Sequence, residues 1–170
     1  TITEGHPEVQ NAHWIDTANT YHKGVLRRIE EQSEHPLAEA IIQYLRKENI
    51  QPEEVTKFNS ITGKGVCGTG KDGVPYFVGN YKLMAEHDLE ITAKTQQTYD
   101  QWKEQGMTVI FFANGKTVLG ILGITDKIKP TSAKAIALLQ KRGIAVYMLT
   151  GDNAKTAAVV SQQVGITRFQ

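Results

Sequence analysis

Two apolar segments joined at Asn114-Gly115 constrain the fold of this chain more than any other feature. Residues Met107–Ala113 and Thr117–Thr125 have the composition of strands and lie on either side of that dipeptide. Asn-Gly is favoured in tight β-hairpins because both residues tolerate the positive φ angles that such turns require. The sequence therefore predicts that these two segments pair as antiparallel strands.

Further strands and helices extend this unit. Lys71-Asp72-Gly73 has the residues of a second tight turn. Short strands are predicted at Val55–Ile61, Gly65–Thr69 and Val74–Val78. Helices are predicted around residues 16–32, 36–49, 80–87 and 92–105, the first of them capped by Asp16 or Thr17. We therefore expect an α+β unit in which helices flank an antiparallel sheet.

The pattern of elements changes after Asp126. A helix at Ser132–Arg142, an apolar strand at Ile144–Leu149 and a helix at Ala154–Val164 follow one another. Strands that alternate with helices in this way are typical of a parallel α/β unit. We therefore expect residues 10–120 to form one domain, inserted into a partial α/β domain made of residues 1–9 and 121–170.

Charge and cysteine content exclude several classes of function. Nineteen Lys and Arg residues against eighteen Asp and Glu residues give a formal net charge of +1. This balance argues against nucleic acid as a partner. The single cysteine, Cys67, excludes a disulfide framework and any multi-cysteine metal site. The longest apolar stretch, Val118–Ile124, is far too short for a membrane span.

Glu30 and the run Ser33-Glu34-His35-Pro36-Leu37 are the first candidate site. Proline breaks the first helix there and starts the second, so His35 is expected at the surface, where its ring can stack on a ligand or hydrogen-bond to it. The alternative is that Ser33 or Glu34 caps the second helix and that His35 is simply exposed.

The second and third candidates are glycine segments. Gly63-Lys64-Gly65-Val66-Cys67-Gly68 fits a dinucleotide-binding pattern, but no helix can start after it, so that interpretation fails. A glycine turn that lets a ligand approach the backbone remains possible, as does a purely structural turn. Gly79-Asn80 ends a strand, and Asn80 is suited either to capping the next helix or to contacting a ligand.

The fourth candidate is Thr150-Gly151-Asp152, at the end of the predicted apolar strand. Ligands of open α/β sheets bind beyond the carboxyl ends of strands. A hydroxyl, a glycine amide and a carboxylate at that point suit a phosphate with its Mg²⁺. Helix capping without a ligand is the alternative.

Taken together, these motifs resemble the heavy-metal-transporting P-type ATPases, and among them the copper exporters. Thr1-Ile2-Thr3-Glu4-Gly5 is similar to the end of their phosphorylation signature, Ser33–Leu37 to their Ser-Glu-His-Pro-Leu motif and Thr150–Asp152 to their Thr-Gly-Asp motif. The resemblance covers the whole chain. It implies the nucleotide-binding domain of such a pump at residues 10–120 and part of the haloacid dehalogenase-like phosphorylation domain in the rest.

The resemblance also implies a role for each candidate. ATP would bind at Glu30, His35, Gly63, Gly65, Gly79 and Asn80, whereas Thr150, Gly151 and Asp152 would lie near the γ-phosphate and Mg²⁺. The acceptor aspartate of the family is absent from this sequence, so we expect the chain to contain no catalytic residue and to bind ATP without turnover.

The whole pump implied by the resemblance is an integral membrane protein with this region in the cytosol. Its partners would be the actuator and membrane domains, and the transported ion, Cu⁺ in our interpretation, would be exported without binding to this region. The alternative is a non-catalytic, nucleotide-independent interaction or regulatory module of the same fold. A phosphatase of the haloacid dehalogenase fold is disfavoured, because such an enzyme does not need the histidine motif or the glycine pair.

Overall fold

A computed structural model describes residues 2–15, 18–150 and 154–168 of the chain. Its centre is one six-stranded, fully antiparallel sheet in the order β1-β6-β5-β4-β3-β2. The strands are β1 (Thr3–Trp14), β2 (Val55–Ile61), β3 (Gly65–Gly70), β4 (Pro75–Gly79), β5 (Thr108–Ala113) and β6 (Val118–Ile128). The antiparallel sheet predicted from the turn residues is confirmed.

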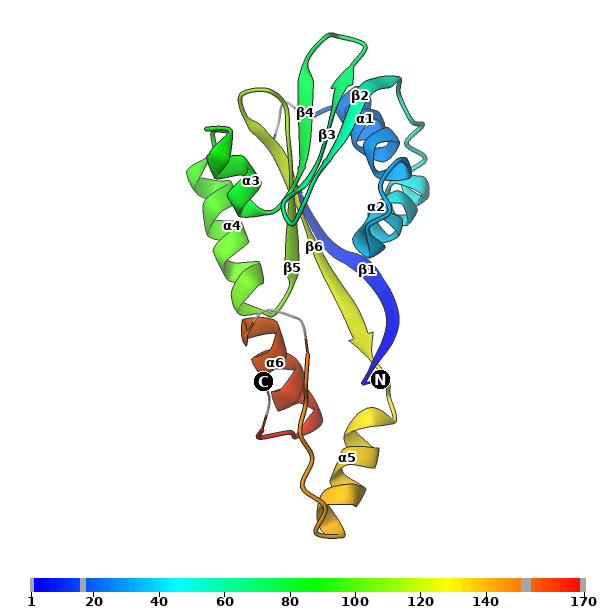
Figure 1. Cartoon of the computed structure of the whole chain (residues 1–170), viewed down its shortest axis with the longest axis vertical. Coiled ribbons are helices and arrows are strands. Elements are labelled where there is room, and N and C mark those ends of the chain that lie inside the picture. The colour runs from blue at the N-terminus through cyan, green and yellow to red at the C-terminus, as the bar shows by residue number, and fades with distance from the viewer. Residues whose placement is uncertain (1, 16–17, 151–153, 169–170) are drawn as a thin grey trace.

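Two pairs of helices cover the two faces of this sheet, as Figure 1 shows. The helices are α1 (Thr20–Glu31) and α2 (Pro36–Lys47) on one face, and α3 (Tyr81–Glu86) and α4 (Ala93–Glu104) on the other. Each face has its own apolar core, with Leu26 and Ile41 in the first and Leu83 and Phe111 in the second. The sheet is therefore buried on both sides over its central strands.

The predicted β5–β6 hairpin forms, although neither Asn114 nor Gly115 has the positive φ angle of a tight Asn-Gly turn. Asn114 closes the β5–β6 hairpin through its side chain, whose oxygen accepts hydrogen bonds from the N–H groups of Lys116 and Thr117 at 3.0 and 2.8 Å. Helix α1 begins later than predicted, because Asn19 is its N-cap. The expected caps, Asp16 and Thr17, lie outside the described residues.

The long strand β1 was not predicted. Its sequence contains Gly5 and Pro7, and its pairing with β6 has irregularities near both Pro7 and Asn11. Asp126 stabilises one of them, since its carboxylate accepts hydrogen bonds from the N–H groups of Gly5 and His6 at 3.1 and 3.2 Å. The expected domain junctions near residues 9 and 120 both lie within continuous strands, β1 and β6, and the division into two domains stays a prediction.

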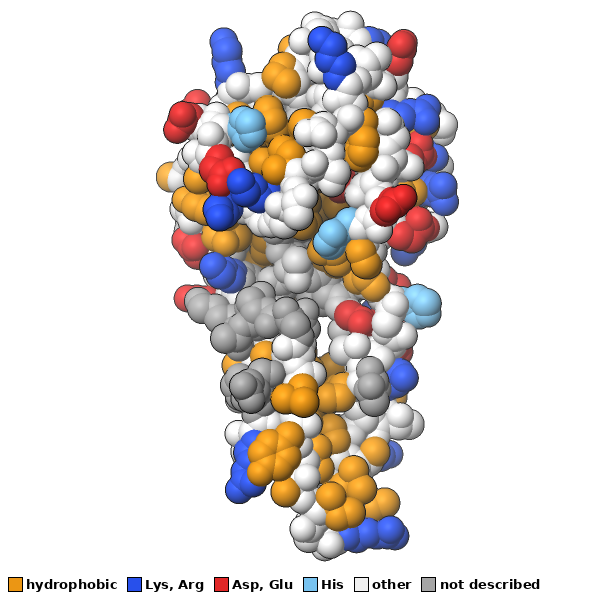
Figure 2. Space-filling model, viewed as in Figure 1, with side chains coloured by type: hydrophobic (Ala, Val, Ile, Leu, Met, Phe, Trp, Pro, Cys, Tyr) orange, Lys and Arg blue, Asp and Glu red, His pale blue; other side chains and the backbone are white. Residues whose placement is uncertain are grey.

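The strand predicted at Ile144–Leu149 is wrong. Helices α5 (Ser132–Lys141) and α6 (Ala154–Val164) form, but the segment between them is not part of the sheet. The residues Ile144, Tyr147 and Leu149 are 50, 61 and 79% exposed, and Figure 2 shows apolar side chains gathered at this end of the molecule. A strand needs a neighbour for its backbone hydrogen bonds, and no described strand lies beside this segment.

Among the described residues, no helix is both long enough and apolar enough to cross a bilayer.

A contact between two glycine backbones fixes the position of the β2–β3 turn. Gly65 pairs with Gly79 across strands β3 and β4. A Cβ atom on Gly65 would lie 2.0 Å from the carbonyl oxygen of Val78, whereas one on Gly63 would meet nothing within 4 Å. Gly65 is therefore required for strand packing, and Gly63 only for its φ of 70°.

This difference gives a matched pair of substitutions. We expect Gly65→Ala to lower the free energy of unfolding by about 3 kcal/mol or more, because the clash is with backbone. Gly63→Ala should cost only about 1 kcal/mol, the strain of a left-handed alanine. Urea unfolding followed by circular dichroism measures both, and equal losses would contradict this account of the turn.

Candidate functional site

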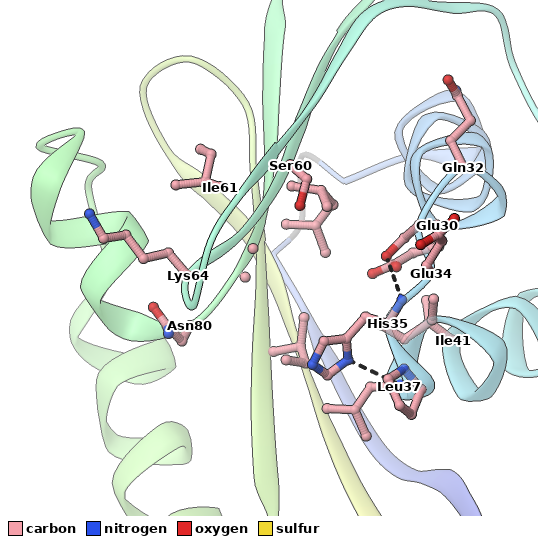
Figure 3. Close-up of a pocket in the computed structure, with 18 of the residues that line it drawn as sticks. Glu30, Gln32, Glu34, His35, Leu37, Ile41, Ser60, Ile61, Lys64 and Asn80 are labelled. Carbon is pink, nitrogen blue, oxygen red and sulfur yellow. Dashed lines mark hydrogen bonds between the residues drawn. The ribbon is translucent and has the colours of Figure 1, made fainter.

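One pocket of about 770 Å³ lies between the α1–α2 connection and the β2–β3 turn. Its size is that of a typical small-molecule site. The lining includes all six residues predicted to bind nucleotide, which come from separate segments of the chain: Glu30, His35, Gly63, Gly65, Gly79 and Asn80. Figure 3 shows Glu30, Glu34 and His35 on one side of the pocket and Lys64 and Asn80 on the other.

Glu30 is a carboxyl group almost removed from water. Its residue is 5% exposed, at the end of helix α1, and its carboxylate makes no hydrogen bond or ion pair within the described chain. Burial raises the pKa of this carboxyl to about 7, since the charged form loses hydration that nothing replaces. An unpartnered acid that lines a pocket is suited to a ligand that donates hydrogen bonds.

His35 is held by the start of helix α2. Its Nδ1 accepts a hydrogen bond from the N–H of Leu37 at 3.2 Å, so His35 itself is the N-cap, and not Ser33 or Glu34. Ser33 supports it by accepting from the N–H of His35 at 3.2 Å. With Nδ1 as acceptor, the neutral ring carries its proton on Nε2, which faces the pocket in Figure 3.

Asn80 ties the glycine turn to helix α3. Its side-chain oxygen accepts from the N–H of Leu83 at 3.1 Å, and its Nδ2 donates to the carbonyl oxygen of Gly63 at 3.0 Å. The N–H of Asn80 also donates to the carbonyl oxygen of Lys64 at 2.9 Å. Both the capping role expected of Asn80 and a contact with the candidate glycines are therefore present.

The floor of the pocket is apolar, and of the residues named below only Leu37 belongs to a motif of the sequence analysis. It is formed by side chains from α2 and from the sheet, among them Leu37, Ile41, Phe58, Val78 and Ile110. For the other four residues the only sequence signal is the apolar periodicity of their helix and strands, which all core residues share. Such a floor suits a flat aromatic group, because it removes one face of the ring from water.

Of the fourth candidate segment, the structure describes only Thr150. Thr150 is partly buried and is not among the pocket-lining residues, and Gly151 and Asp152 lie outside the described residues. No group of three or more His, Cys, Asp or Glu side chains in the described ranges could hold a metal ion. The Mg²⁺ expected near Thr150, Gly151 and Asp152 stays a prediction.

Comparison with known families identifies the chain. The family of haloacid dehalogenase-like hydrolases matches residues 1–169. The chain belongs to this family. The haloacid dehalogenase-like part of the predicted fold is thereby confirmed.

Curated relatives of this haloacid dehalogenase-like chain are copper-type P-type ATPases. It is 37% identical over 166 residues to the probable copper-importing P-type ATPase A of Enterococcus hirae, an alignment that covers 98% of this chain and 22% of that protein. It is 36% identical over 166 residues to a copper-exporting P-type ATPase of Staphylococcus aureus, and this alignment covers 98% of this chain and 20% of that protein. The resemblance predicted from the motifs is confirmed, and the chain spans about a fifth of the length of these relatives.

Solved structures agree on the fold. A zinc-transporting PIB-type ATPase in the E2·Pi state matches with a TM-score of 0.75 and 23% identity, over 100% of this chain and 27% of that one. The catalytic CPx-ATPase domain CopB-B matches with a TM-score of 0.70 and 21% identity, over 99% of this chain and 55% of that one.

The raised pKa of Glu30 predicts a pH-dependent cost of folding. The carboxyl of Glu30 has a pKa of about 7 in the folded state and of about 4.5 in the unfolded state. The free energy of unfolding therefore falls as the pH rises between those two values. Above that window, Glu30→Gln should raise the free energy of unfolding by on the order of 3 kcal/mol. It should change little near pH 4. Denaturant titrations across this range test it, and an equal effect at every pH would contradict it.

Proposed function

We propose that this chain is the ATP-binding cytosolic region of a P-type ATPase that translocates a heavy-metal ion. The observation that carries the proposal is the pocket itself, in which a buried, unpartnered carboxylate and a capped histidine face a glycine turn across an apolar floor. The names of the relatives support copper as the ion, which we take to be Cu⁺. The name of the Staphylococcus aureus relative supports export, whereas that of the Enterococcus hirae relative gives import.

Adenine suits the chemistry of this pocket. Its exocyclic amine is a donor that the carboxylate of Glu30 can accept, and its flat ring suits both the apolar floor and the ring of His35. Guanine presents a carbonyl acceptor at the corresponding ring position, which opposes the carboxylate at a pH above the pKa of Glu30, where this group is ionised. The site should therefore bind ATP in preference to GTP.

Phosphoryl transfer depends mainly on positioning and charge neutralisation. We propose that the pocket holds ATP by its base and delivers the γ-phosphate to an aspartate outside these 170 residues. Thr150, Gly151 and Asp152 would lie near that phosphate and the Mg²⁺ that neutralises it. The chain alone would bind ATP without turnover, and its partners would be the actuator and membrane domains of the pump.

Nucleotide titration of the wild type and of two histidine variants tests the proposal. His35→Asn keeps an oxygen that can cap helix α2 but removes the imidazole, so the fold should persist. We expect the wild type to prefer ATP over GTP, and His35→Asn to weaken ATP binding by about tenfold, which is 1.4 kcal/mol. Calorimetry or NMR chemical shifts measure both.

His87→Ala is the matched control. His87 is exposed, its ring contacts Phe77 at a tilt, and it does not line the pocket, so its removal should leave ATP binding unchanged. A folded wild type that fails to bind millimolar ATP would contradict the proposal and favour a nucleotide-independent interaction module.

A further inference from the structure

The charges of the pocket are distributed unevenly. Glu30 and Glu34 lie on one side, and Lys64, on the β2–β3 turn, lies on the other (Figure 3). Among the described lining residues, Lys64 is the only lysine or arginine. A ligand with a neutral ring and an anionic tail therefore has one favourable orientation, with its tail away from the two carboxyl groups.

The backbone of Lys64 is fixed at the edge of the pocket, but its side chain points away from the pocket. Its carbonyl oxygen accepts from the N–H of Asn80 at 2.9 Å, and its neighbour Gly65 packs against Gly79, so the main chain is fixed. The side chain runs toward helix α3, where Nζ lies 2.7 Å from a carboxylate oxygen of Glu86.

The ion pair of Lys64 with Glu86 is easily exchanged. The two side chains are 30 and 40% exposed, and pairs in such positions contribute about 0–1 kcal/mol. A diphosphate or triphosphate carries more charge than one carboxylate and can form charge-assisted hydrogen bonds with the ammonium group. Lys64 can therefore change partners without any movement of the backbone.

Building on the proposed ATP site, we propose that Lys64 contacts the phosphate chain of the nucleotide, and that Glu86 competes with the phosphates for it. Lys64 thereby sets how strongly the site distinguishes ADP and ATP from adenosine. Neither residue touches the base, so the base-binding side of the pocket works without them.

Titrations with adenosine, AMP, ADP and ATP, at fixed ionic strength and without divalent metal, test this role. We expect Lys64→Ala to weaken ADP and ATP binding by roughly tenfold and to leave adenosine unchanged. Glu86→Gln should strengthen ADP and ATP binding by up to about fivefold, with no effect once Lys64 is absent. Lys64→Arg should keep most of the difference in affinity between ATP and adenosine, because arginine retains the positive charge.

Lys82→Ala is the matched control, since Lys82 is an exposed lysine of helix α3 near Glu86 that does not line the pocket. It should leave all four ligands unaffected. An equal loss of adenosine and ATP binding in Lys64→Ala would overturn the inference, as would no loss at all, while the ATP site itself would stand. A folded wild type that binds none of the four ligands would overturn both proposals.

Discussion

The close contact between the backbones of Gly65 and Gly79 is the constraint on which the rest of the site depends. A side chain on Gly65 would clash with the carbonyl of Val78, so the contact exists only because neither strand carries a Cβ there. It brings the β2–β3 turn against the start of helix α3, where Asn80 locks it by bonding to Gly63. This wall of the pocket therefore combines the backbone of the two glycine segments with the side chains of Lys64 and Asn80.

The opposite wall depends on burial. Glu30 is buried near the end of helix α1, and the break before Pro36 makes His35 the N-cap of α2, with one ring nitrogen engaged. The fold bears the cost of an unpartnered carboxyl at this position, which is typical of a site that a ligand completes. Both walls therefore present oriented hydrogen-bonding groups around an apolar floor.

Local signals in the sequence predicted the parts of this structure that local chemistry decides. Asn114, Asn80 and Pro36 set a turn, a cap and a helix start through their own side chains, and each formed where it was expected. Strand β1 and the segment from Ile144 to Leu149 were misjudged, because a strand exists only where a neighbour supplies its hydrogen bonds. The burial of Glu30 and the pairing of Lys64 with Glu86 could not be predicted either, since both depend on which elements pack together.

The most direct test of the central claim, that the two walls bind one nucleotide between them, is to map ATP on the chain by amide chemical shifts. The account predicts that ATP shifts the amides of Gly63, Gly65, Gly79 and Asn80 together with those around Glu30 and His35, with one common affinity. Shifts confined to one wall, or centred on helices α5 and α6, would contradict it.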